Sequence, residues 1–169
     1  GNWTLDTLNQ YADGTYIDLN GDGYHEFICP GGKKSGYSGY YFHVSTGGAD
    51  NYPDAHRLAV GDYCFTPQVL KILREDICNG EGDFEETLRI ASPKFKLDTE
   101  GALKRNPKGF PTDAPYSEYL RLKSYCLCYM PDEAFIYKEN LASRVAALFR
   151  TTKPFLDYIN RAIDFSREE

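Results

Sequence analysis

The sequence predicts an α+β fold, in which a largely antiparallel sheet from the N-terminal half is packed on one face by helices that come mostly from the C-terminal half. Three observations predict it. Strand-like segments separated by turn residues fill the chain before Thr66, and amphipathic helical patterns dominate after it. Aromatic residues make up 15% of the chain, with 14 Tyr and 10 Phe, and such side chains suit the pleated, half-buried surface of a sheet.

The expected strands are identified by alternation and by the turns between them. Asn20-Gly21-Asp22-Gly23 supplies the positive-φ residues that a hairpin turn needs, and Pro30-Gly31-Gly32 breaks the chain after it. In the third strand, Tyr41 and His43 share one face, because side chains alternate along a strand. Strands are expected at residues 15–19, 24–29, 39–45, 57–65 and 125–130.

The period changes to that of a helix at Thr66-Pro67, where Thr is a good N-cap and Pro suits the first helical position. Asn79-Gly80 is expected to end this helix. Further helices are expected at residues 83–91 and 117–123, and two more close the chain. The apolar positions of the closing helices are Leu141, Val145 and Leu148 in the first, and Phe155, Ile159, Ala162 and Ile163 in the second.

Length and charge limit the function classes. A chain of 169 residues fits a single domain, spanning residues 1–169, and buries enough surface for a core of its own. The 19 Lys and Arg residues against 25 Asp and Glu give a net charge of −6, which argues against nucleic acid or an anionic membrane as the partner. Every apolar stretch is too short to cross a bilayer.

The chain has five cysteines, at positions 29, 64, 78, 126 and 128. An odd number in a domain with its own core indicates free thiols in a reducing compartment, so we expect a cytoplasmic protein. Cys126 and Cys128 share a strand face, but they have neither the spacing nor the second pair of a zinc knuckle. All five are interpreted as buried small hydrophobic residues, and no cofactor is expected apart from the Ca²⁺ considered below.

Four segments carry a resemblance to a known family: GGKKSGYSGYYFHVSTGG (31–48), GDYCFTPQVLKILREDI (61–77), LKRNPKGFPTDAPYSEYLRLKSY (103–125) and RVAALFRTTKPFLDYIN (144–160). They are similar to the uncharacterised domain-of-unknown-function family 2461, over about residues 27–165. The PKGFP and YLRLK segments are the most specific, followed by Tyr40-Tyr41 before His43. Members of the family carry an N-terminal helical section and a basic stretch that residues 1–26 lack, which makes 1–26 an atypical segment. The resemblance implies no established activity.

Residues 18–26 (DLNGDGYHE) have the spacing of a calcium-binding loop. Their oxygen-bearing groups and the bend at Gly23 suit a hard cation such as Ca²⁺. Cys29 stands where an EF-hand needs its bidentate Glu, so the segment is more similar to the short calcium loops between propeller strands. The alternative is an ordinary hairpin with turn residues chosen for φ, which the lack of a second copy favours. The candidate ligands are Asp18, Asn20, Asp22, the Tyr24 carbonyl and Glu26.

A second candidate site centres on His43. A histidine beside a tyrosine, with several cations from the family-like segments around it, would suit an anionic small molecule or acid/base chemistry at His43. The alternative is a partly buried histidine in a sheet, with the cations in solvent or paired to carboxylates. The candidate ligand-binding residues are Tyr41, His43, Arg57, Arg74, Lys108 and Lys123.

Three functions stay open at this point. The first is a small-molecule or protein-binding accessory domain that uses the strand face of Tyr41 and His43. The second is an enzyme that acts on a small anionic metabolite, with His43 as the catalytic acid/base. The third is a calcium-stiffened structural domain. We also expect a homodimer, because a shortened family fold would leave apolar surface uncovered.

Overall fold

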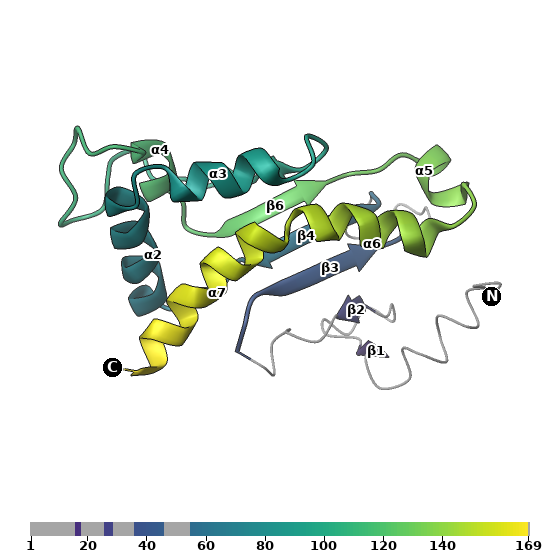
Figure 1. Cartoon of the computed structure of the whole chain (residues 1–169), viewed down its shortest axis with the longest axis horizontal. Helices are drawn as coiled ribbons and strands as arrows, with labels where there is room; N and C mark the ends of the chain where they lie inside the picture. Colours follow the sequence, from purple (N-terminus) through teal and green to yellow (C-terminus); the bar gives the residue numbers. More distant parts are fainter. Residues whose placement is uncertain (1–15, 18–25, 29–35, 46–54, 169) are drawn as a thin grey trace.

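The chain folds as a sheet with helices along one face, in a computed structural model that describes residues 16–17, 26–28, 36–45 and 55–168 (Figure 1). Its strands are β1 (Tyr16–Ile17), β2 (Glu26–Ile28), β3 (Gly39–His43), β4 (Arg57–Asp62), β5 (Lys96–Leu97) and β6 (Tyr125–Tyr129). Its helices are α2 (Pro67–Asn79), α3 (Asp83–Ile90), α4 (Ser117–Leu120), α5 (Glu133–Tyr137), α6 (Leu141–Thr151) and α7 (Lys153–Glu168).

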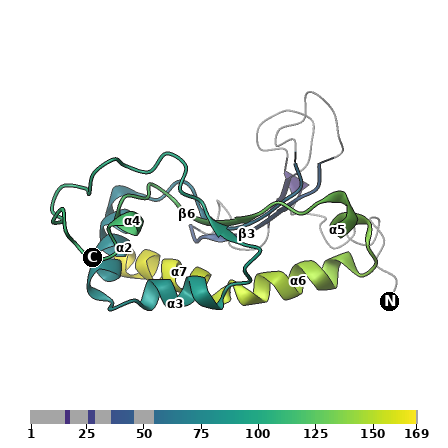
Figure 2. The ribbon, with the colours of Figure 1, turned by 90° about the horizontal axis from the view of Figure 1, so that it is seen from above.

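The six described strands form one sheet in the order β1-β2-β3-β4-β6-β5, and every neighbouring pair is antiparallel. Helices α3, α6 and α7 run along the same side of this sheet (Figure 2). The predicted α+β class, with the sheet largely from the first half of the chain and the helices mostly from the second, is therefore confirmed.

The first helix forms as its sequence predicts. Pro67 occupies the first turn, and the Thr66 hydroxyl accepts a hydrogen bond from the Val69 amide at 3.3 Å. The apolar stripe Val69, Leu73 and Ile77 is buried in the core. The helix is thus held by a side-chain cap at one end and by burial along one side.

Several expected elements end earlier than predicted: β3, α3 and β6 by one or two residues, and β4 and α4 by three. β4 stops at Asp62 rather than at residue 65, because the Asp62 carboxylate accepts a hydrogen bond from the Cys64 amide at 2.8 Å and closes a local turn. α4 ends at Leu120, and the buried Leu122 then leads into β6.

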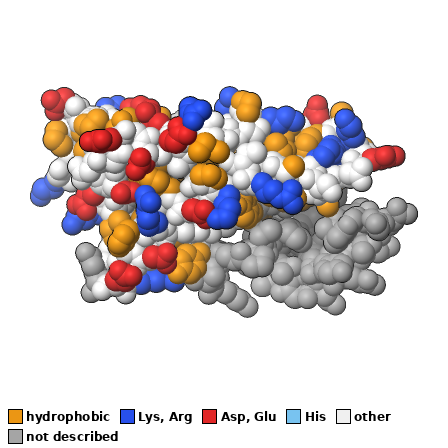
Figure 3. Space-filling model, viewed as in Figure 1, with side chains coloured by type: hydrophobic (Ala, Val, Ile, Leu, Met, Phe, Trp, Pro, Cys, Tyr) orange, Lys and Arg blue, Asp and Glu red, His pale blue; other side chains and the backbone are white. Residues whose placement is uncertain are grey.

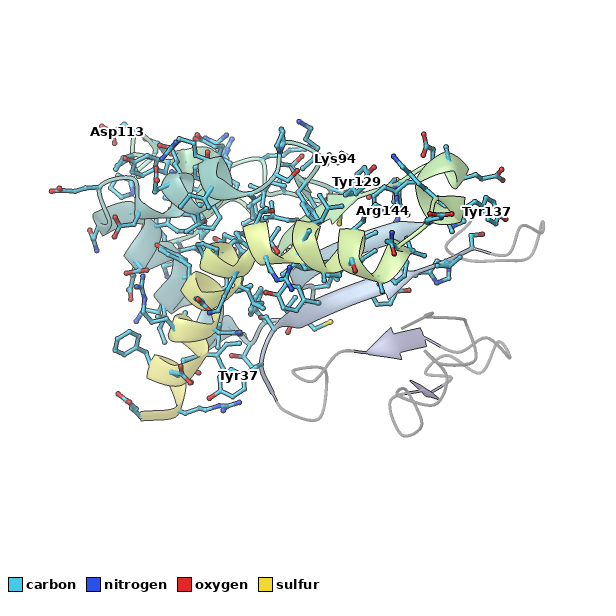
Figure 4. The ribbon with its side chains drawn as sticks, turned by 45° about the vertical axis from the view of Figure 1, so that its right-hand side comes forward. Tyr37, Lys94, Asp113, Tyr129, Tyr137 and Arg144 are labelled. Atoms are coloured by element: carbon cyan, nitrogen blue, oxygen red, sulfur yellow. The ribbon has the colours of Figure 1, made fainter. Side chains whose placement is uncertain are left out.

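The structure adds two short elements that the sequence patterns do not predict, β5 and α5. α5 has five residues, too few to be stable alone. The Asp132 carboxylate caps its start, and Arg144 from α6 donates to the Phe135 and Lys138 carbonyls at 2.7 and 2.6 Å. Arg144 and Lys94, both labelled near this end of the sheet in Figure 4, also lie over the Phe135 ring. These contacts come from residues outside the helix, so a pattern within its five residues does not predict it.

The core lies between the sheet and the helices. Its sheet side consists of Tyr40, Phe42, Leu58, Val60, Tyr125 and Leu127. Phe84 of α3 is the central ring, with its centroid 5.0–5.9 Å from those of four other aromatic residues, Tyr119, Tyr125, Phe155 and Tyr158. On the surface of this helical side, acidic and basic side chains are interspersed (Figure 3). None of the described helices combines the length and apolar character needed to span a bilayer.

Side chains that alternate with the core residues point to the opposite side of the sheet. Because directly opposed residues share a face, the register groups Tyr41, His43, Arg57, Ala59, Cys126 and Cys128 together. We call this surface the outer face. Ala59 and Cys126 are buried there, although neither belongs to the core cluster on the helical side.

Candidate functional site

His43 and Arg57 face each other on the outer face, as opposed residues at the end of the β3–β4 pair. The side chains of such a pair lie within contact distance. The Tyr41 ring stacks on the His43 ring at a centroid distance of 6.2 Å, with an angle of 4° between their planes. Arg57 Nε is buried, and no acceptor among the described residues meets it. The structure therefore joins an imidazole, a phenol and a guanidinium.

The ends of β3 and β4 are tied by a histidine that sequence reasoning did not single out. His56 Nδ1 accepts a hydrogen bond from the Ser45 amide at 3.1 Å. Since Nδ1 accepts, the neutral ring carries its proton on Nε2. This bond fixes the chain immediately before Arg57 and helps to position the His43–Arg57 pair.

The other three predicted cations lie elsewhere. Arg74 is on α2, on the helical side of the sheet, where it donates to the Leu122 carbonyl at 2.7 Å. Lys123 is exposed just before β6, and the first residue of β6 pairs with Asp62, at the end of β4 opposite to Arg57. Lys108 lines a separate pocket. The expected convergence of cations on His43 therefore holds for Arg57 alone among the four, because strand register and helix placement separate the rest.

Lys108 belongs to a pocket of about 300 Å³ between α2 and the loop before α4. Lys71, Glu75 and Phe110 also line it, and Lys71 and Glu75 form an exposed ion pair at 3.7 Å. The loop is held by Asn106, whose amide nitrogen donates to the Pro111 carbonyl at 2.6 Å and to the Ser117 hydroxyl at 2.9 Å. Arg121 Nε donates to the side-chain oxygen of Asn106, Oδ1, at 3.0 Å. The PKGFP segment is thus shaped by a side-chain network.

The outer face also carries two thiols. Cys126 Sγ and Cys128 Sγ are 3.8 Å apart, and the Tyr63 hydroxyl lies 3.2 Å from Cys128 Sγ. All four described cysteines are free, as the sequence predicts. Their expected burial is wrong for Cys64, which is exposed, and only partly right for Cys78 and Cys128. The early end of β4 leaves Cys64 outside the sheet, while Cys29 lies outside the described residues.

The two thiols differ in acidity. The pKa of the Cys128 thiol is lowered to about 7, chiefly by the hydrogen bond with Cys126 and also by the Tyr63 hydroxyl and the Arg57 charge, while burial and the charge of Asp98 act in the opposite direction. The same bond to Cys128, together with burial, raises the pKa of Cys126. Burial and the neighbouring sulfurs raise the pKa of Tyr63. The negative charge therefore resides on Cys128, and the other two groups keep their protons and donate to it.

The calcium loop proposed from the sequence lies outside the described residues at Asp18, Asn20, Asp22 and Tyr24, and only the backbone of Glu26 is placed, in β2. Within the described part of the chain, no group of three or more His, Cys, Asp or Glu residues is arranged to hold a metal ion.

Comparison with known proteins identifies the family. A family model described as a conserved hypothetical protein (DUF2461) matches residues 22–158, a match that begins slightly before the expected residue 27. Neither the comparison with curated proteins nor that with solved structures gave a match. Since this family model covers most of the chain, this protein belongs to the DUF2461 family.

Proposed function

We propose that this protein is a binding domain for a small anionic molecule, and that the ligand contacts the outer face at Tyr41, His43 and Arg57. The observation that supports it best is Arg57, whose Nε is buried without an acceptor among the described residues. A buried donor that lacks a partner is costly, and a charged one especially so. A carboxylate or phosphate oxygen would satisfy it through a charge-assisted hydrogen bond.

The neighbours of Arg57 suit the same ligand. His43 and Tyr41 offer polar groups on a rigid strand, and their stacked rings present a flat edge beside the guanidinium. The free thiols in the described part of the chain support a reducing compartment, and we propose the cytoplasm.

An enzyme that acts on a small anionic metabolite, with His43 as the acid/base, is the second candidate. It needs cations that hold the substrate beside His43. Arg57 is the one of the four predicted cations that lies there, while Arg74 is engaged with the Leu122 carbonyl. The geometry thus favours binding over catalysis.

The test is a thermal shift measurement with phosphate, pyrophosphate and citrate at constant ionic strength. An anion present at about 100 times its Kd adds about 2.7 kcal/mol to the unfolding free energy, which raises the Tm of a domain of this size by about 5–10 °C. We expect that rise for at least one of the three anions.

Matched variants locate the effect. Arg57→Gln should abolish the rise, whereas Lys123→Gln removes the same charge from an exposed position at the other end of the β4–β6 pair and should preserve it. If both variants respond like the unaltered protein, the anion binds elsewhere and the proposal is wrong.

A further inference from the structure

Cys126 and Cys128 form a thiol pair that the proposed anion site does not use. They are two positions apart on β6, so both side chains leave the same face of the strand, with their sulfurs 3.8 Å apart. Cys126 is opposite Gly61, and Gly61 is opposite Gly39. On the β4 side of this row, the sheet therefore places no side chain directly opposite Cys126.

Hydrogen bonding concentrates the negative charge on one of the two sulfurs. The Cys126 sulfur and the Tyr63 hydroxyl both lie within hydrogen-bonding distance of Cys128 Sγ, and both can donate to it when Cys128 is a thiolate. Arg57, diagonally across on β4, adds a positive charge, and Lys96 of β5 is directly opposite Cys128. Asp98 opposes them. These two hydrogen-bonding groups and two nearby cations act against burial and one carboxylate, and they favour the thiolate of Cys128 over that of Cys126.

Cys128, the more acidic of the two thiols, is also the more exposed to solvent. Cys128 is half-buried and reachable from solvent, whereas Cys126 is only 1% exposed. A reagent that approaches the outer face therefore meets the thiolate first and the thiol second.

From this geometry we propose that Cys128 and Cys126 form a redox site that reduces hydroperoxides, with Cys128 as the attacking thiolate and Cys126 as the resolving thiol. The Cys128 thiolate attacks the terminal oxygen of the hydroperoxide. A sulfur–oxygen bond forms, the oxygen–oxygen bond breaks, and the alcohol or water leaves after taking up a proton. Cys128 is thereby oxidised to a sulfenic acid.

The second step involves the neighbouring thiol. Cys126 loses its proton and attacks the sulfur of the sulfenic acid; a disulfide bond forms, the sulfur–oxygen bond breaks, and the oxygen leaves as water. Overall, two thiols and one hydroperoxide give one disulfide, one alcohol and one water. A dithiol reductant returns the pair to its starting state by thiol–disulfide exchange.

Strand geometry makes the disulfide easy to reduce. Residues two apart on a strand have Cα atoms about 6.6 Å apart, near the upper limit of about 6.8 Å for a disulfide. The sulfurs must also move from 3.8 Å to a bonding distance of about 2.05 Å. A disulfide formed under such constraint has a high reduction potential, so a dithiol reduces it readily and it does not act as a structural cross-link.

The experiment uses the full chain, hydrogen peroxide as the probe and peptide mass mapping as the readout, with the exposed Cys64 as the internal reference. At pH 6, a thiol with a pKa of about 7 has about thirty times more thiolate than a free cysteine in a model peptide, whose pKa is about 8.5. The thiolate of lower pKa is also about fivefold less nucleophilic, which reduces this thirtyfold advantage. We therefore expect Cys128 to be oxidised about sixfold faster than Cys64 at pH 6, and the advantage to shrink as the pH rises above 8.

The products identify the roles. The unaltered protein should yield a peptide in which Cys126 and Cys128 have lost two hydrogens, and dithiothreitol should restore it. Cys126→Ser should stop at a Cys128 sulfenic acid that dimedone traps, whereas Cys64→Ser should leave the disulfide unchanged. The proposal is overturned if Cys64 reacts faster than Cys128 at pH 6, or if the unaltered protein forms no bond between residues 126 and 128. Both measurements need no variant, so they stand even where a serine disturbs folding, and neither depends on anion binding at His43 and Arg57.

Discussion

Phe84→Ala should cause a large loss of stability, because the ring is central to the core. Phe84 is 2% exposed, and its ring centroid lies 5.0–5.9 Å from those of four aromatic rings contributed by α4, β6 and α7. Truncating a buried Phe to Ala costs about 3–5 kcal/mol, because the transfer free energy of the removed atoms is lost and a cavity is left behind. For a chain of 169 residues, each kcal/mol shifts the Tm by about 2–4 °C. We expect a fall of about 12 °C.

Urea denaturation followed by far-UV circular dichroism measures the loss of unfolding free energy directly, and the Tm is a second readout. Phe165→Ala is the matched control: Phe165 is 54% exposed on α7, so the same chemical change should cost no more than about 0.5 kcal/mol. Phe84→Leu should fall between the two, because it keeps apolar volume but loses the ring pairs. A loss below about 1.5 kcal/mol for Phe84→Ala, or equal losses at the two positions, would refute the packing described here.

Two further predictions concern the loop before α4 and the N-terminal turn. Asn106→Ala removes three hydrogen bonds that hold the loop and should cost about 1–3 kcal/mol, whereas Lys108→Ala, at an exposed position in the same loop, should leave the midpoint of urea unfolding nearly unchanged. For residues 18–26, the hairpin interpretation predicts the same Tm in excess EDTA and in millimolar Ca²⁺. A rise of about 5–10 °C in Ca²⁺ would instead establish a metal site.

Local sequence patterns predicted much of the fold because they act over a single element. The Thr66-Pro67 start of α2 is confirmed by its cap, and the apolar stripe of α7 is buried where its spacing places it. β5 and α5 were not predicted. Two and five residues are too few to show a period, and both elements depend on partners outside themselves, β6 for one and Arg144 of the next helix for the other.

The candidate site was also predictable only in part from the sequence. Alternation along one strand was enough to place Tyr41 and His43 on one face, and Cys126 and Cys128 on one face. It could not show that Arg57 is opposite His43, or that Tyr63 reaches Cys128. It also could not separate Arg74 and Lys123 from His43.

The sequence by itself determined the fold class, the family and the free state of the four described thiols, since these follow from composition, periodicity and motif. Only the tertiary structure decided which side chains meet. Strand order and register are set by hydrogen bonds and packing between segments far apart in the chain, and a shift of one residue would move every side chain to the other face. That is why the neighbours of Arg57 and the acidity of Cys128 were visible only in the folded chain.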